Sequence, residues 1–205
     1  MARPSQKEER RRQIVAGLLR TMAQQGYAGA TVATIAREAD LTPGLVHYYF
    51  DSKQAILLAL MQGIGRGVLG RFEERLERAG DDPWKQLFAL TDALLERDPT
   101  GGTAPLQAGW LVIAAEAIHQ PAVREEYSRM LFALVDRIDG LLRGVLKSEG
   151  RSTRSSRSLA AAIAAAIQGV YQLDAAAPSA SKPGSSAPAL RHMVEGLVAA
   201  QPGRR

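Results

Sequence analysis

The chain has 205 residues, enough for one sizeable hydrophobic core or two small ones, and a formal net charge of +5. It has no cysteine and three scattered histidines, which excludes disulfides and thiolate metal sites, so we expect no metal and no cofactor. The N-terminus lacks an apolar stretch after its charges, and no 18-residue uncharged apolar run follows. We therefore expect neither a signal peptide nor a membrane span, and a cytoplasmic protein.

Positive charge is unevenly distributed along the chain. Residues 1–78 carry 12 Lys and Arg against 8 Asp and Glu, residues 79–149 carry 7 against 11, and residues 150–205 carry 7 against 2. A basic N-terminal third before an acidic middle fits a phosphate-facing module joined to a part that does not face phosphate. A general bias of the genome toward arginine raises arginine everywhere, so the charge by itself leaves both interpretations open.

The composition favours an all-α fold, because alanine, leucine and arginine are abundant and aromatic residues make up only 5% of the chain. Ser5 and Glu8 form a capping-box pattern that starts a helix near residue 6, and Gly26 ends it. Arginines at 10–12 lie on its opening turns, as phosphate-attracting groups or as a solvated face. The apolar stripe of this helix consists of Ile14, Val15, Leu18 and Met22.

Residues 31–53 contain the densest helix signals in the chain. Thr31, Thr42 and Asp51 each precede a helix-compatible run, and their side-chain oxygens can accept the N–H groups of a first helical turn. Pro43 takes a first helical position, and Gln54 stands three residues after Asp51, as in a capping box. The first short helix has an apolar face made of Val32, Ile35, Ala36 and Ala39.

The second short helix is barely two turns long. Its spacing places Gly44, His47 and Tyr48 on one side, pointing outward. The side that points inward consists of Val46, Tyr49 and Phe50. A small residue, a histidine and a tyrosine on the open face of so short a helix predict a contact surface.

Residues 8–60 contain a spaced set of residues: Gly26-Tyr27, Thr31-Val32, Ile35-Ala36, Ala39, Leu41-Thr42, Gly44, Tyr49-Phe50 and Lys53. In this pattern the segment resembles the DNA-binding region of the TetR family of bacterial one-component repressors. Asp40 departs from the pattern, because the family usually has glycine at the bend between the two short helices. Aspartate tolerates a left-handed backbone better than most residues, so we expect the bend to survive at some cost in stability.

The resemblance implies a set of DNA contacts. The recognition-helix positions that meet bases or nearby backbone are Pro43, Gly44, Leu45, His47 and Tyr48, and the phosphate-facing positions are Thr31, Tyr49 and Lys53. We add Thr42, the cap of the recognition helix. The Thr31 hydroxyl and the Lys53 ammonium each lie at a helix N-terminus, which favours binding of an anion such as phosphate. The alternative for Tyr49 and Phe50 is that both are core residues. With few bidentate donors here, thymine methyls and DNA shape carry part of the specificity.

Beyond residue 52 the sequence predicts six further helices, over residues 52–79, 83–98, 104–120, 121–150, 158–177 and 188–200. Residues 65–70, GRGVLG, match the dinucleotide fingerprint, but without a preceding strand we interpret the match as chance. The four glycines at 63, 65, 67 and 70 each weaken a helix by roughly 0.8 to 1 kcal/mol relative to alanine. They predict a bend or a frayed segment, and close packing is the alternative.

The C-terminal part includes WLVIAAEAIHQPAVREEY at residues 110–127 and AAAIQGVYQL at residues 164–173. In pattern these segments resemble the TetR family more loosely, and most closely its branch of choline- and betaine-responsive repressors. This implies that residues 158–177, apolar almost all round, and residues 188–200 pair across a two-fold axis in a homodimer. The loop over 178–188 is predicted to be mobile. The resemblance also implies an effector pocket among Trp84, Phe88, Trp110, Ile113, Tyr127, Met130 and Tyr171. Each of these side chains alone also fits an ordinary core position. Glu116 and His119 are either polar anchors of this pocket or solvated residues on a helix face.

The sequence shows no catalytic motif, so we expect no enzyme. We expect an all-α homodimer with a three-helix helix-turn-helix DNA-binding domain over residues 1–52 and a larger helical effector-binding and dimerisation domain over residues 53–205. Its expected function is repression at a pseudo-palindromic double-stranded operator, relieved by an unknown small molecule. The alternatives are an all-α small-molecule-binding or interaction protein without specific DNA binding, and an activator or DNA-organising protein.

Overall fold

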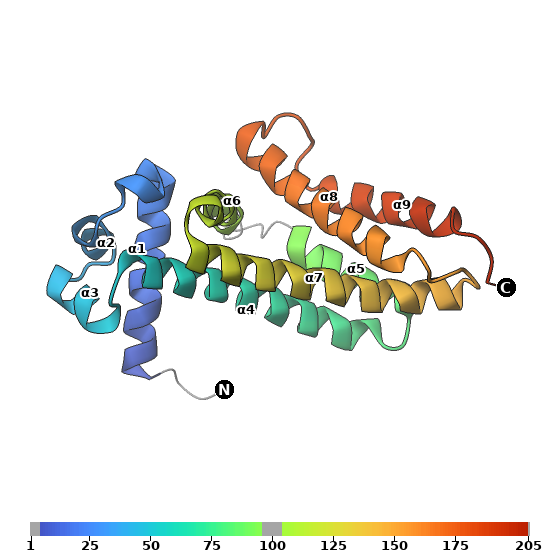
Figure 1. The fold of residues 1–205 in the computed structure, drawn as a ribbon, viewed down its shortest axis with the longest axis horizontal. Helices are drawn as coiled ribbons and strands as arrows, with labels where there is room; N and C mark the ends of the chain where they lie inside the picture. The colour runs from blue at the N-terminus through green and yellow to red at the C-terminus, as the bar shows by residue number, and fades with distance from the viewer. Residues whose placement is uncertain (1–4, 96–103, 205) are drawn as a thin grey trace. The chain divides into compact units, whose positions relative to one another are not determined.

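The computed structural model describes residues 5–95 and 104–204, and all the regular elements in these residues are α-helices (Figure 1). They are α1 (Gln6–Gly29), α2 (Val32–Glu38), α3 (Pro43–Tyr49), α4 (Lys53–Ala79), α5 (Pro83–Leu95), α6 (Ala104–His119), α7 (Pro121–Ser148), α8 (Ser156–Ala176) and α9 (Ser186–Ala199). The all-α prediction is confirmed. The predicted end of the fifth helix, residues 96–98, lies outside the described residues.

The chain divides into two compact units. One consists of residues 1–65 and 99–127, and the other of residues 66–98 and 128–205. One boundary therefore falls within α4, between Gly65 and Arg66, and another within α7. The division into domains at residue 52 concerns function rather than compactness, and it stays a prediction.

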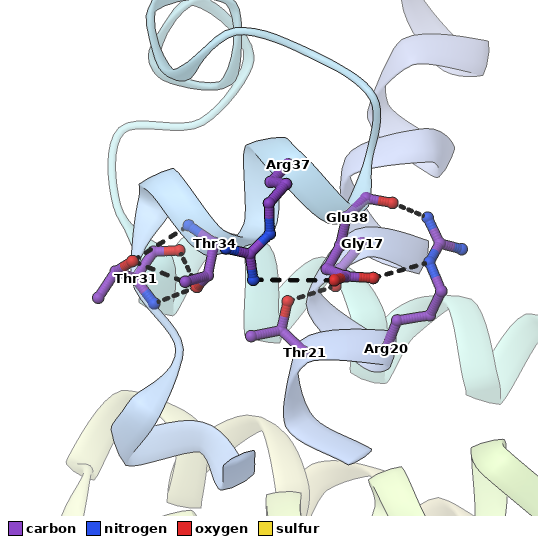
Figure 2. Close-up of polar contacts among 7 residues, drawn as sticks. All are labelled: Gly17, Arg20, Thr21, Thr31, Thr34, Arg37 and Glu38. Atoms are coloured by element: carbon purple, nitrogen blue, oxygen red, sulfur yellow. Dashed lines mark hydrogen bonds and ion pairs between the residues drawn. The ribbon is translucent and has the colours of Figure 1, made fainter. Parts of the chain in front are cut away.

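In the first unit, α1 packs closely on α2. Gly17 makes this possible, because a Cβ atom at this position would lie 2.7 Å from the Ile35 carbonyl oxygen and 2.9 Å from the Ala39 Cβ. The Thr21 hydroxyl on the same side of α1 donates to the Gly17 carbonyl at 2.8 Å (Figure 2). The buried residues of these helices and α3 include Ile14, Leu18, Met22, Ile35, Ala36, Val46 and Phe50, which confirms most of the predicted apolar faces.

The end of α1 differs slightly from the prediction. Gly26 has φ 70° and ψ 173°, which interrupts the helix, but helical backbone continues to Gly29. The predicted end is thus a kink three residues before the real end. The kink places Tyr27 in the core, where it is buried.

Helix α6 belongs to the same compact unit as α1 to α3. A Cβ atom at Gly109 would lie 2.7 Å from Leu19 Cδ1 of α1, so the two helices are in close contact at this point. Trp110, Ile113 and Ala117 are buried along α6.

Helix α4 is one continuous helix from Lys53 to Ala79, so the chance interpretation of its glycine pattern is confirmed and no frayed segment is present. A Cβ atom at Gly63 or Gly70 would meet nothing within 4 Å, which rules out close packing as the reason for these two glycines. By length and composition α4 and α8 could each cross a membrane. This is weak evidence, because helices that bury an apolar face in a core meet the same criteria.

In the second unit, α8 and α9 lie side by side (Figure 1). The Tyr171 hydroxyl of α8 donates to the Leu94 carbonyl of α5 at 2.9 Å, and Arg191 of α9 forms an ion pair with the buried Asp92 of α5. Helix α9 begins at Ser186, so the predicted loop over 178–188 is a shorter link over 177–185 with turns closed at Ala180 and Ser185.

Candidate nucleic-acid interface

The two short helices are held by the caps that the sequence predicts. The Thr31 hydroxyl accepts the Thr34 N–H at 3.1 Å, and the Thr34 hydroxyl accepts the Thr31 N–H at 2.9 Å (Figure 2). The Thr42 hydroxyl accepts the Leu45 N–H at 3.3 Å, with Pro43 at the start of α3. The reciprocal pair on α2 and the single bond on α3 satisfy donors that a two-turn helix cannot satisfy by itself.

The bend between α2 and α3 turns on Asp40. This residue has φ 54°, the left-handed conformation expected for it. After it, the Leu41 N–H donates to the Ala36 carbonyl at 2.9 Å, which closes the end of α2. The bend therefore survives the replacement of glycine by aspartate, as the sequence predicts.

Helix α3 presents an open face. Pro43, Gly44, His47 and Tyr48 are exposed, and the Tyr48 side chain is 78% exposed. Leu45 and Tyr49 are half-buried, while Val46 and Phe50 are buried beneath the helix. Four of the five predicted base-facing residues, all except the half-buried Leu45, thus lie on the exposed face of α3, above a buried core.

Helix α1 supports α3 through Arg11, a role that sequence reasoning missed. Its guanidinium lies 4.0 Å from the Phe50 ring centroid, and its Nη1 donates to the Tyr49 carbonyl at 2.6 Å. This cation–π contact and charge-assisted bond close the C-terminal end of α3. Arg10 donates to the Gln13 side chain, and Arg12 pairs with Glu9. Phosphate attraction by these three arginines stays a prediction.

The predicted cap of α4 is wrong. The Ser52 hydroxyl, not the Asp51 carboxylate, accepts the Ala55 N–H, at 3.1 Å. Gln54 does not close a capping box with Asp51, because its Nε2 donates to the Gln120 Oε1 at 2.9 Å. The local pattern assigned the Gln54 side chain to the helix cap, but that side chain binds Gln120, which is 66 residues away in the sequence.

Lys53 has internal partners. Its ammonium donates to the Tyr27 carbonyl at 2.9 Å and to the Ala30 carbonyl at 2.8 Å, and it lies 4.2 Å from the Tyr27 ring centroid. Two of its three donors thus stabilise the last turn of α1, where orphan carbonyls attract a cation. Lys53 is therefore a structural link between α1 and α4, and its contact with phosphate stays a prediction.

A second ionic link joins α1 to α2. Glu38 lies 3.8 Å from Arg20 Nε and 4.0 Å from Arg37 Nη2, and the Glu38 carbonyl accepts a further bond from Arg20 (Figure 2). These arginines are largely exposed, so the ionic part contributes little stability. Its geometric effect is to hold the C-terminal end of α2 against α1.

The predicted effector residues fall in both compact units. The first unit contains Trp110, Ile113 and Tyr127, and the centroids of the Trp110 and Tyr127 rings lie 4.9 Å apart. Burial raises the pKa of Tyr127, and a hydrogen bond with Trp110 opposes the rise. Trp84, Phe88, Met130 and Tyr171 belong to the second, where the Trp84 and Phe88 rings lie 5.4 Å apart. The structure thus brings together two aromatic pairs, and a pocket common to all seven residues stays a prediction.

The two predicted polar anchors have different surroundings. Glu116 is half-buried and accepts a hydrogen bond from Gln120 Nε2 at 2.6 Å, whereas His119 is exposed. Gln120 thereby connects α6 to Gln54 and so to the first turn of α4. Burial raises the pKa of Tyr27, with a Gln120 hydrogen bond opposing the rise.

A capped two-turn helix with an open face, seated on two further helices, defines a helix-turn-helix DNA-binding head. The family model for bacterial regulatory proteins of the tetR family matches residues 14–60. Over 171 residues the chain is 30% identical to the HTH-type transcriptional regulator BetI of Paraburkholderia phytofirmans, with 83% of this chain and 84% of that protein covered. Over 112 residues it is 38% identical to BetI of Stenotrophomonas maltophilia, covering 55% and 56%.

Solved structures share the fold. A transcriptional regulator from Rhodococcus sp. matches with a TM-score of 0.79 and 22% identity, covering 93% of this chain and 97% of that one. A regulator from Saccharomonospora viridis in complex with choline matches with a TM-score of 0.73 and 24% identity, covering 97% and 100%. The chain belongs to the tetR family, and it is a DNA-binding transcriptional regulator. Its relatives are regulators and not enzymes.

Proposed function

We propose that this protein is a homodimeric repressor in the cytoplasm, which holds a pseudo-palindromic operator through α3 of each subunit and releases it when a small molecule binds. The observation that carries this proposal is the open face of α3, with His47 and the 78% exposed Tyr48 above a buried Val46. The Tyr48 ring meets the Tyr49 ring edge to face at 5.0 Å, but most of its surface faces solvent, so packing within the subunit uses little of it. Base edges and thymine methyls in a major groove are suitable partners for it.

The apolar surface of α8 and α9 supports the dimer. Only 28% of the most apolar stretch of α8 is buried within the chain. Leu173 on α8 is 51% exposed and Met193 on α9 is 40% exposed. A second copy that covers these helices would bury this surface. A dimer that reads successive major grooves needs its two recognition helices about 34 to 36 Å apart, one turn of B-DNA.

An effector releases DNA only when it binds the released conformation more tightly, and such couplings are typically about 1 to 3 kcal/mol. Helix α6 is a suitable element for this coupling, because it belongs to the compact unit of the head. Its C-terminal end reaches α4 through the hydrogen bond between Gln120 and Gln54. The structural relative from Saccharomonospora viridis holds choline, which makes choline the first compound to test.

The test is a mobility-shift titration with the DNA that flanks the gene, at two salt concentrations. Wild-type protein is expected to bind one site specifically, with an affinity that falls as salt rises because phosphates are neutralised. The substitutions His47→Ala and Tyr48→Ala should each weaken specific binding by about 1 to 3 kcal/mol. The matched control is His119→Ala, an exposed histidine of α6 that should leave binding unchanged.

Absence of specific, salt-sensitive binding by the wild type would refute the proposal and favour a small-molecule-binding protein. The sign of regulation needs a separate measurement. Transcription from the bound promoter should rise when the gene is deleted, and a fall would identify an activator.

A further inference from the structure

Gln107 on α6 lacks an interaction that buried amides normally have. Its side chain is only 9% exposed, and its Nε2 has no hydrogen-bond partner within residues 5–95 and 104–204. Buried polar side-chain groups in folded proteins nearly always have a partner, because leaving a donor unsatisfied is unfavourable. An unsatisfied donor at this depth therefore indicates a partner that residues 5–95 and 104–204 do not supply.

An aromatic pair begins one helical turn beyond Gln107. Residues three apart on a helix lie on the same face, which places Trp110 one turn beyond Gln107 on the buried side of α6. The Trp110 ring lies 4.9 Å from the Tyr127 ring of α7, at an interplanar angle of 37°. Both rings belong to the same compact unit as Gln107.

These three side chains define the chemistry of a ligand. The Nε2 group donates, so its partner is an oxygen acceptor such as a carboxylate, carbonyl or hydroxyl. Indole and phenol faces favour an apolar body or a quaternary ammonium group. A neutral amide one helical turn from an aromatic pair matches the usual composition of a small-molecule site, which is mostly apolar with a few placed polar groups.

We infer that Gln107 is the polar anchor of the effector site, where its amide donates to an oxygen of a small ligand whose body lies against Trp110 and Tyr127. The inference rests on the proposed function, since it locates the effector that releases DNA. It narrows the seven aromatic and aliphatic candidates to the pair on α6 and α7, and it adds a residue that the sequence interpretation did not include. A ligand here would bind the helix that Gln120 directly follows, and the Gln120 side chain bonds to α4.

The experiment uses the full chain with Trp84→Phe, which leaves Trp110 as the single tryptophan because the chain has two. Three probes separate the parts of the ligand. Glycine betaine carries both a carboxylate and a quaternary ammonium, 3,3-dimethylbutanoate has the same shape without the cation, and tetramethylammonium lacks the oxygen acceptor. Each is titrated against Trp110 fluorescence and thermal unfolding, in this background and with Gln107→Leu added.

At least one oxygen-bearing probe is expected to bind the parent protein, and Gln107→Leu should weaken that binding at least about tenfold, the effect of losing about 1.4 kcal/mol. Without probe, Gln107→Leu should leave the unfolding midpoint unchanged or raise it, because leucine removes an unsatisfied donor. Tetramethylammonium should bind both proteins alike or neither. Preference for glycine betaine over 3,3-dimethylbutanoate identifies a cationic ligand body, and the reverse preference an apolar one.

Two results would overturn the inference: no binding of either oxygen-bearing probe to the parent protein, or a lower unfolding midpoint in Gln107→Leu together with unchanged probe affinity. The second result would show that Gln107 supports the fold. Operator binding is measured in the same proteins without probe, and Gln107→Leu should match its parent. If neither binds DNA the proposed repressor function fails, while the fluorescence titration still decides whether the site exists.

Discussion

Replacement of Gly17 by alanine tests the packing that supports the recognition helix. The added Cβ would lie 2.7 Å from the Ile35 carbonyl oxygen, 2.9 Å from the Ala39 Cβ and 3.1 Å from the Ala39 nitrogen. Two of these atoms are backbone, so relief requires α2 to move as a whole. Overpacking of this kind typically destabilises by about 1 to 3 kcal/mol, against a gain of up to about 1 kcal/mol from replacing a helical glycine. We expect Gly17→Ala to be destabilised by about 1 to 2 kcal/mol.

The matched control is Gly63→Ala in α4, where the added Cβ meets nothing within 4 Å. That variant should gain about 0.5 to 1 kcal/mol, because alanine favours the helix and encounters no obstruction. Urea denaturation followed by circular dichroism measures both variants, and operator binding shows whether α3 has moved. If Gly17→Ala is as stable as Gly63→Ala and binds operator like the wild type, α1 and α2 do not pack as described.

Three further outcomes follow from the contacts. Ser52→Ala should lower the unfolding free energy by about 0.5 to 2 kcal/mol in urea denaturation, whereas Asp51→Ala should change it much less, and equal effects would contradict the assignment of the cap. Tyr171→Phe should lower the unfolding free energy by about 1 to 3 kcal/mol, because the buried Leu94 carbonyl loses its donor. Burial also raises the pKa of Tyr171 above its ordinary 10.0, so the stability that the neutral phenol contributes should be lost as pH rises beyond 10. Phenolate absorbance should then appear together with unfolding. Gln120→Leu should leave operator affinity intact while it weakens effector-induced release by about 0.5 to 2 kcal/mol, and unchanged release in mobility shifts would exclude this route.

The sequence interpretation was most accurate where partners are three or four residues apart. The caps at Ser5, Thr31 and Thr42 are bonds from i to i+3, and the left-handed Asp40 follows from the backbone of a single residue. Such interactions depend on local geometry, which the order of residues fixes directly. The same holds for the helical periodicity that buried Val46 and exposed Tyr48.

The tertiary structure decided the contacts that cross the chain. Arg11 reaches Tyr49, Lys53 reaches Tyr27 and Gln54 reaches Gln120, over separations of 38, 26 and 66 residues. A long polar side chain has many possible partners, and its choice depends on which backbone carbonyls and amides the packing of helices brings within reach. For this reason local patterns assigned Gln54 to a cap, and they gave no signal for the buried, unsatisfied amide of Gln107, whose environment exists only after α6 has packed.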